Sequence, residues 1–306
     1  MNDNFYRKTG IAITCIARDL MGRSPGERMP IIQKYQEMFD LSRGTVQNAL
    51  KFLKEAGAVS YSSRGHLGTF IDQIDFGILQ GYAVDGLTGT MPLPYSLLYE
   101  GFATGLYENM QKSSVNLRMA YMRGSRERIQ CLADGIYQFA VVSRYAAKTA
   151  AELGQAVRPV MDFGAYSYLS RHIMLFAKPG KTAIEDGMLV GLDPDSYDHC
   201  ALTREMTRGK HVKYINMPGN QQIYALTAGL IDVGIWNYDE IREKNYQNLT
   251  YSFLEESQME ADMSAAVILC RTEDDVTPAI LKKNLSEEGV LDIQQKVLQG
   301  EMIPHY

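Results

Sequence analysis

The spacing of apolar residues changes in kind near residue 72, and this change limits the folds open to the chain. Before it, apolar residues recur every three or four positions, as on one face of an α-helix. After it, short apolar runs alternate with helical stripes, which is typical of α/β domains. At about 150 residues per domain, the chain has room for two domains. We predict a small domain over residues 1–71, a polar linker over 72–76 and a larger domain over 77–306.

Three amphipathic helices and a hairpin are predicted in residues 1–71. The apolar stripes of the helices comprise Ile13, Ile16, Ala17 and Leu20, then Ile32, Tyr35 and Phe39, then Val46, Ala49, Leu50 and Leu53. Ser42 is a favourable N-cap for the third helix, and Gly57 ends it. Two β-type runs, 59–62 and 68–71, flank a glycine-containing loop, as in a hairpin. This order of elements predicts an α+β winged helix-turn-helix.

The exposed face of the third helix and the hairpin loop carry groups that bind nucleic acids. Guanidinium, hydroxyl and amide groups hydrogen-bond to base edges and to phosphates. A charged helix face is often simply solvated, but the preceding helix, the short turn and the basic loop favour binding to double-stranded DNA. The expected DNA-binding residues are Ser42, Arg43, Thr45, Gln47, Asn48, Lys51, Arg64, Gly65 and His66.

The net charge of −5 conceals an asymmetry that supports this interpretation. Residues 1–71 contain ten Lys and Arg against six Asp and Glu, a net charge of +4. Residues 72–306 carry a net charge of −9. A basic domain attached to an acidic one indicates an anionic partner for the basic domain.

Residues 77–306 are predicted to form two β/α units and therefore two lobes. The first unit has strands over 78–84, 115–121 and 139–142, helices over 94–110 and 127–133, and a loop over 85–90. The second has strands over 188–192, 212–215 and 231–236 and helices over 197–207 and 221–228. Alternating strands and helices imply parallel sheets. With a return strand over 265–271, lobe I covers about 77–160 and 265–306, and lobe II about 165–260.

Polar side chains at the ends of these strands are the candidate ligand-binding residues. In open α/β sheets, ligands bind beyond the carboxyl ends of the strands. The candidates are Thr88, Arg123, Ser125, Ser143, Arg144, Asp193, Ser196, Asn220, Trp236 and Asn237. Arg123 with the following helix N-terminus would suit a carboxylate or phosphate, although a solvated basic turn is an alternative. Trp236 fits a cleft wall and a core position equally well.

The first domain resembles the GntR-type winged helix over segments 26–30, 41–53, 55–57 and 68–70. The resemblance implies that Ser42, Arg43 and Thr45 contact DNA. It also implies that the wing tip, Arg64 to His66, lies near the minor groove. Two positions depart from the family: residues 31–33 are Ile-Ile-Gln where Ser-Glu-Arg is usual, and Gln47 replaces a second recognition arginine. Because Gln favours adenine where Arg favours guanine, the operator should differ from a typical GntR site.

The second domain is similar to the type 2 periplasmic-binding-protein fold, which also serves as the effector domain of LysR-type regulators. A helix, a glycine and a strand recur in that order around Gly135 and around Gly229. The combination of the two domains resembles the YhfZ-type transcriptional regulators. This resemblance implies an architecture and leaves the ligand open.

No catalytic or metal-binding motif was found in the sequence. It contains no P-loop, no HExxH, no GxSxG and no complete GxGxxG. We therefore expect no enzyme activity, no cofactor and no metal. An enzyme with an accessory DNA-binding head is the alternative, and a purely architectural DNA-binding protein is a third possibility.

The expected function is that of a bacterial regulator whose second domain binds a small, anionic effector and modulates operator binding. The longest apolar run has six residues, whereas a membrane span needs about 20. The four cysteines form no CxxC pair and no secretion signal is recognisable, so we expect reduced thiols in a cytoplasmic protein. A homodimer is expected because one winged helix reads few base pairs.

Overall fold

The structure is a computed structural model of the 306-residue chain. It describes residues 3–83, 87–112, 115–244, 246, 249–255 and 257–306. The chain divides into two compact units, which we call the head unit and the body unit. The head unit consists of Met1–Leu87, Met110–Arg118 and Asp275–Asn284, and the body unit of Thr88–Asn109, Met119–Asp274 and Leu285–Tyr306. The head unit thus includes two segments from beyond residue 77.

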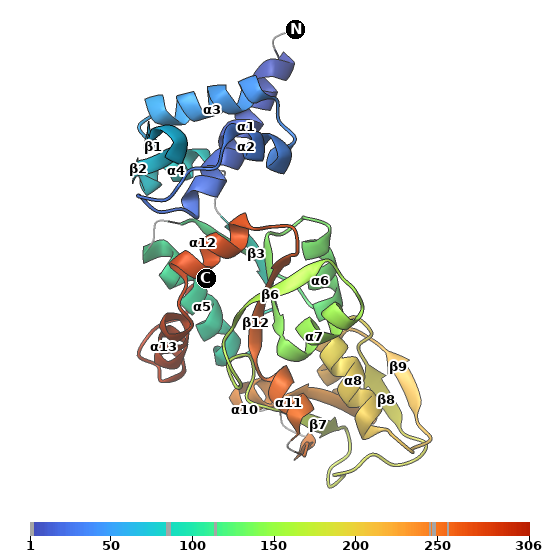
Figure 1. Cartoon of the computed structure of the whole chain (residues 1–306). Helices are drawn as coiled ribbons and strands as arrows, with labels where there is room; N and C mark the ends of the chain where they lie inside the picture. The colour runs from blue at the N-terminus through green and yellow to red at the C-terminus, as the bar shows by residue number, and fades with distance from the viewer. Residues whose placement is uncertain (1–2, 84–86, 113–114, 245, 247–248, 256) are drawn as a thin grey trace. The chain divides into compact units, whose positions relative to one another are not determined.

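The head unit has the predicted helix-turn-helix and hairpin (Figure 1). Its elements are α1 (Asp3–Met21), α2 (Ile32–Phe39), α3 (Arg43–Glu55), β1 (Val59–Ser63), the 3-10 turn η1 (Gly65–Leu67) and β2 (Thr69–Ile74). Strands β1 and β2 pair antiparallel. The core contains Ile16, Leu20, Tyr35 and Leu53, all fully buried. The hydroxyl of Tyr35 donates to Asp19 Oδ2 at 2.7 Å, and Arg23 binds the same carboxylate with two nitrogens.

The predicted strand over 78–84 is wrong, because this segment lies in a helix, α4 (Phe76–Tyr82). The Asp75 carboxylate caps it by accepting the N–H of Ile78 at 2.9 Å. Leu79 and Ala83, four positions apart, are both buried, which is helical rather than strand periodicity. Val84 lies outside the described residues. The expected linker is likewise structured, since Asp72 to Ile74 complete β2.

The expected loop over 85–90 is also wrong in its described part, which begins strand β3 (Leu87–Met91) of the first body sheet. The other strands of this sheet are β4 (Leu117–Tyr121), β5 (Phe139–Ser143), β6 (Val157–Asp162) and β12 (Ala266–Arg271), in the order β4-β3-β5-β12-β6. Strands β3 and β5 are parallel, but β12 runs antiparallel to β5 and β6. The sheet is therefore mixed and not purely parallel as predicted. We call the part of the body built on it lobe I.

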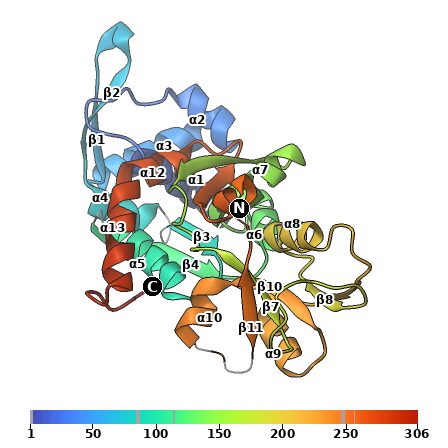
Figure 2. The same cartoon turned by 90° about the horizontal axis from the view of Figure 1, so that it is seen from below.

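The second body sheet is also five-stranded and mixed, and the part built on it is lobe II (Figure 2). Its strands are β7 (His172–Phe176), β8 (Leu189–Leu192), β9 (Lys213–Asn216), β10 (Val233–Asn237) and β11 (Thr250–Phe253), in the order β11-β7-β10-β8-β9. Strand β8 is parallel to β9 and β10, whereas β7 is antiparallel to β10 and β11.

Helices follow most of these strands. They are α5 (Leu97–Lys112), α6 (Ser125–Ala133), α7 (Arg144–Glu152), α8 (Tyr197–Met206), α9 (Gln222–Thr227), α10 (Tyr238–Lys244), α11 (Gln258–Met263), α12 (Val276–Asn284) and α13 (Glu287–Leu298). The sequence did not predict α7 or α10 to α13. None of the described helices combines the length and the apolar character needed to cross a membrane.

Candidate functional site

Helix α3 presents a polar face and is fixed at its start by Ser42. The hydroxyl of Ser42 accepts the N–H of Thr45 at 3.2 Å and shares a hydrogen bond with the Thr45 hydroxyl at 2.7 Å. Thr45 is buried, so its side chain belongs to the cap and not to the exposed face. The structure thus places Thr45 away from the surface where a DNA contact was predicted.

The remaining predicted residues of α3 are exposed: Arg43, Gln47, Asn48 and Lys51. Arg43 and Gln47 line a groove of about 700 Å³ between α2, α3 and the hairpin. The groove is also lined by Ile31, Ile32, Gln33, Gln36, Tyr61 and Thr69. Lys51 makes a weak surface ion pair with Glu55 at 3.8 Å. Among the described residues, no hydrogen bond or ion pair engages the side chains of Arg43, Gln47 and Asn48, so they are available to contact another molecule.

The wing tip is exposed, and two arginines lie along it. The guanidinium of Arg64 stacks 4.5 Å from the centre of the Phe70 ring. Gly65 has a positive φ of 58°, and His66 is exposed beside it. The backbone of Arg28 forms an isolated antiparallel β-bridge with that of Phe70. The Arg28 side chain lies against Gly68, where an added Cβ atom would come within 2.7 Å of the Arg28 Nε. Arg28 was not among the predicted contact residues, although the GntR-like segment 26–30 contains it.

A pocket of about 110 Å³ lies between the two lobes of the body, beyond the carboxyl ends of several strands. Seven of the ten predicted ligand-binding residues line it: Arg123, Ser125, Asp193, Ser196, Asn220, Trp236 and Asn237. The lining also includes Tyr95, Tyr99, Arg128, Tyr168, His172, Asp198 and His199, which the sequence did not indicate as ligand contacts. Seven of the strand-end residues therefore lie together, and their role in ligand binding stays a prediction.

Direct contacts join lobe I to lobe II beside this pocket. Arg123 donates to Asp195 Oδ2 at 2.8 Å, and the Asp195 carbonyl accepts the N–H of Arg126 at 3.0 Å. The Ser125 hydroxyl accepts the N–H of Tyr197 at 2.9 Å. These hydrogen bonds connect the start of α6 in lobe I to the start of α8 in lobe II. Arg123 and Ser125 thus hold the lobes together as well as lining the pocket.

Three predicted residues lie outside the lining of the pocket: Thr88, Ser143 and Arg144. The Thr88 hydroxyl donates to Gln138 Oε1 at 3.2 Å. Ser143 caps α7 and donates to Asp198 Oδ1 at 2.7 Å, which adds a further contact between the lobes. These side chains already have partners within the protein.

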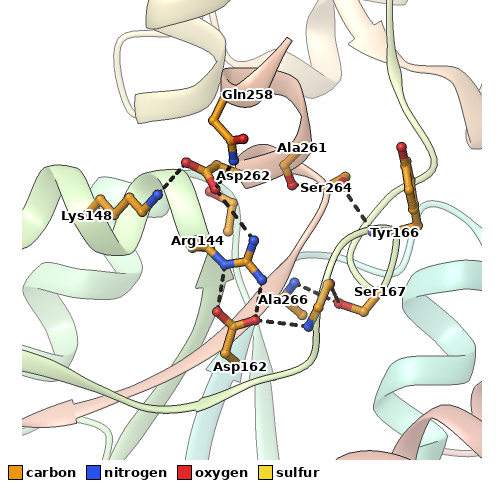
Figure 3. Close-up of polar contacts among 12 residues, drawn as sticks. Arg144, Lys148, Asp162, Tyr166, Ser167, Gln258, Ala261, Asp262, Ser264 and Ala266 are labelled. Atoms are coloured by element: carbon orange, nitrogen blue, oxygen red, sulfur yellow. Dashed lines mark hydrogen bonds and ion pairs between the residues drawn. The ribbon is translucent and has the colours of Figure 1, made fainter. Parts of the chain in front are cut away.

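Arg144 belongs to a separate ion-pair cluster (Figure 3). Its guanidinium donates two hydrogen bonds of 2.6 Å to Asp162 and lies 3.5 Å from Asp262. Lys148 donates to Asp262 at 2.6 Å. The hydrogen bonds from Arg144 lower the pKa of Asp162 below its usual value. This cluster accounts for Arg144 without a ligand.

Arg128 also lines the pocket, although it was not among the residues predicted from the sequence. It is 3% exposed, and it donates to the carbonyls of Val141 and Met122 and to the hydroxyl of Tyr168, at 3.2, 2.8 and 3.1 Å. All three partners are neutral. A buried guanidinium normally has an anionic partner, and no carboxylate of the described residues forms a hydrogen bond or ion pair with Arg128. Its neighbour Arg126 is exposed, which is why the run appeared to be a solvated basic turn.

The surroundings of the two histidines in the lining shift their pKa values in opposite directions. His172 pairs with Glu260, with Nδ1 3.1 Å from Oε2. Burial alone would lower the pKa of His172, but the hydrogen bond and charge of Glu260 raise it above the usual value. No carboxylate of the described residues forms a hydrogen bond with the His199 ring, and burial lowers the pKa of His199 to about 4. The pocket therefore contains a neutral imidazole at pH 7.

Trp236 lines the pocket and belongs to the core of lobe II, so both alternatives left by the sequence apply. It is 7% exposed, and its Nε1 donates to Glu240 at 2.9 Å. Its ring centre lies 5.8 Å from that of Tyr95. The aromatic wall and the polar groups together form a small concave site with apolar and polar sides.

Comparison with known proteins supports both parts of this description. Residues 77–306 match the family model of the YhfZ C-terminal domain, and residues 24–71 match a helix-turn-helix domain model. The chain is 30% identical over 308 residues to the Escherichia coli (strain K12) protein YhfZ, and the match covers 100% of each chain. The crystal structure of YhfZ from Shigella flexneri is similar with a TM-score of 0.60 and 28% identity, over 73% of this chain and 94% of that one.

More distant structures are similar to the body in fold. A ligand-binding component of an ABC-type import system from Staphylococcus aureus matches with a TM-score of 0.49 and 14% identity, over 68% of this chain and 77% of that one. The body is an α/β domain with two mixed sheets.

Proposed function

The chain belongs to the YhfZ family, and from this premise we propose that it is a transcriptional regulator controlled by a small anionic effector. The head unit binds a double-stranded DNA operator, and the body binds the effector between its lobes. The observation that carries the effector half is Arg128, a buried guanidinium with three neutral partners that faces the pocket. An anionic ligand would accept hydrogen bonds that no carboxylate of the described residues accepts from Arg128.

The exposed groups of α3 and the wing support the DNA half of the proposal. Arg43 and Gln47 share a groove, and Arg28 and Arg64 lie along the hairpin. Phosphate contacts by such residues make affinity fall steeply with salt concentration. The test is binding of the full chain to its own promoter region at about 50 mM salt, measured by fluorescence anisotropy. Absence of binding under these permissive conditions would overturn the DNA half.

Helix α12 offers a route from effector to operator, because the chain passes from lobe I into the head unit just before it. Helix α12 packs in the head unit, where Ile280 and Leu281 are buried, and Lys283 donates to the Arg23 carbonyl at 2.5 Å. Strand β12 of lobe I ends at Arg271, a few residues before α12 begins. A ligand that shifts lobe I would therefore pull on a helix that contacts α1. This is a population shift that requires different effector affinities in the two states.

A disulfide tests this route. A Cβ atom on Gly22 would lie 3.1 Å from that of Ala279, so a small outward shift would bring the pair to the roughly 3.5–4.5 Å separation of disulfides. We expect Gly22→Cys with Ala279→Cys to abolish the effector response when oxidised and to restore it after reduction. An unchanged response in the oxidised protein would show that α1 and α12 do not move apart.

The finer features of the function are proposals as well. We propose a cytoplasmic homodimer assembled through the body, whose two heads contact half-sites about 34–36 Å apart. We further propose that the protein has no enzyme activity, and turnover of a bound effector would contradict this.

A further inference from the structure

His199 is buried in the pocket, and both nitrogens of its ring are unpaired within the part of the chain that the structure describes. The residue is 9% exposed, and neither Nδ1 nor Nε2 has a hydrogen-bond partner within the described part of the chain. The ring lies near the Ile235 carbonyl without the geometry of a hydrogen bond. A neutral imidazole has one donor and one acceptor, so both functions are available to a ligand.

Asn237 has a second unpaired group in the same pocket. Its Oδ1 accepts the N–H of Asp239 at 2.8 Å, whereas its buried Nδ2 has no partner among the described residues. Buried polar side-chain atoms are hydrogen-bonded in the large majority of cases. A donor of this kind requires an acceptor atom, which either a ligand or a water molecule would supply.

The unpaired hydrogen-bond donors of the lining favour an anion over an ammonium group. Arg128 has three neutral partners, as described above. The two carboxylates of the lining accept hydrogen bonds: Asp193 from the N–H groups of Asp195 and Gly219 at 3.0 and 2.8 Å, and Asp198 from Ser143. Burial raises the pKa of Asp198, which disfavours its charged form, although Arg128 and His172 oppose this shift. The lining therefore offers a guanidinium without a hydrogen-bonded carboxylate and unpaired nitrogens at His199 and Asn237.

Resting on the proposed function, we infer that the effector is a small carboxylate that also carries a hydroxyl or carbonyl oxygen. Its charged group contacts Arg128, and its second oxygen accepts from Asn237 and exchanges a hydrogen bond with His199. The volume of about 110 Å³ restricts the molecule to a few heavy atoms.

Three probes of one carbon skeleton test this chemistry on the full chain. Lactate, propionate and alanine differ only in the group on the second carbon: hydroxyl, hydrogen or ammonium. By titration calorimetry up to about 20 mM, we expect lactate to bind about fivefold to tenfold more tightly than propionate, the value of one net hydrogen bond. Equal binding of lactate and propionate, tightest binding of alanine, or no binding of any probe would overturn the inference.

A variant of His199 separates a ligand contact from a core residue. His199→Phe removes the unpaired nitrogens and keeps a ring of similar shape, so we expect a higher melting temperature without ligand and loss of the preference for lactate. His211→Phe, at an exposed position of the body, should change neither. A lower melting temperature with an intact preference for lactate would show that His199 is structural. Asn237→Ala should also reduce the preference for lactate, which checks the result independently.

These measurements use no DNA. A chain that binds lactate but no promoter would overturn the regulator and leave the pocket chemistry intact. A chain that binds its promoter but none of the probes would overturn the pocket chemistry and leave the DNA-binding proposal intact.

Discussion

The exposed face of α3 and the pocket of the body carry similar polar side chains, but they differ in whether the protein provides hydrogen-bond partners for them. On α3, Arg43 and Gln47 are exposed, and their side chains form no hydrogen bond or ion pair with the described residues. In the pocket, Arg123 is held by Asp195 and Ser125 by Tyr197. Polar groups at the pocket therefore stabilise the fold first, and only those left unpaired are available to a ligand.

This difference indicates where a substitution should affect binding alone and where it should also affect stability. A surface arginine can be removed at little cost to folding, because water replaces its contacts. A buried arginine cannot, since its acceptors lose their donor in a place that water reaches poorly. The predictions below test this contrast from the largest expected effect to the smallest.

Arg128→Met should show the largest effect. The variant leaves the carbonyls of Val141 and Met122 and the hydroxyl of Tyr168 without their donor. We expect the free energy of unfolding to fall by about 3 kcal/mol, together with loss of anion binding. Urea unfolding at pH 7 measures the first effect and calorimetry the second. Arg126→Met, on the same helix but exposed, should cost less than about 1 kcal/mol. Equal losses in the two variants would remove the distinction between buried and exposed arginines.

Arg43→Ala should weaken specific DNA binding by about 1–3 kcal/mol if the side chain reads a base. The free energy of unfolding should stay nearly unchanged, because Arg43 is exposed. Competition binding against unrelated sequence measures the effect. A loss of the same size on every sequence would make Arg43 a phosphate contact. Lys34→Ala is a suitable control, since Lys34 is exposed on α2 and lies outside the lining of the groove.

The same contrast explains how far sequence alone could go. Helical periodicity located α1 to α3 and the exposed face, because local spacing determines which side of a surface helix faces water. It failed at α4, where an Asp75 cap and the burial of Leu79 outweigh a strand-like apolar run. The antiparallel placement of β12 depends on contacts between residues far apart in sequence, which spacing does not reveal.

The pocket residues divide along the same line. Strand ends indicated Asp193, Asn220 and Asn237, because topology brings these ends together. Arg128 and His199 lie inside helices, and their importance comes from the partners they lack. Tertiary packing decides which polar group finds no partner, so neither residue can be identified from local sequence spacing.

Ser42→Ala tests whether Ser42 acts through the fold or through DNA. The N-cap hydrogen bond to Thr45 predicts a loss of about 1 kcal/mol in the free energy of unfolding of the head. DNA affinity measured well below the melting temperature should change little. Ser42→Asp retains a capping acceptor and should restore stability. A loss of DNA affinity without a loss of stability would return Ser42 to the contact surface predicted from the sequence.

The smallest effect concerns Asp162, whose partner Arg144 was expected to bind ligand. Because Arg144 lowers the pKa of Asp162, the pair contributes stability above the usual aspartate pKa, and this contribution is lost as the pH falls below about 4. Solvent screening limits it to well under 1 kcal/mol, since the Asp162 side chain is 44% exposed. Urea unfolding of Asp162→Asn should therefore differ slightly from the parent at pH 7 and converge with it towards pH 3. A variant that instead loses lactate affinity at full stability would place Arg144 in the binding site, and the division between paired and available groups would have to be redrawn.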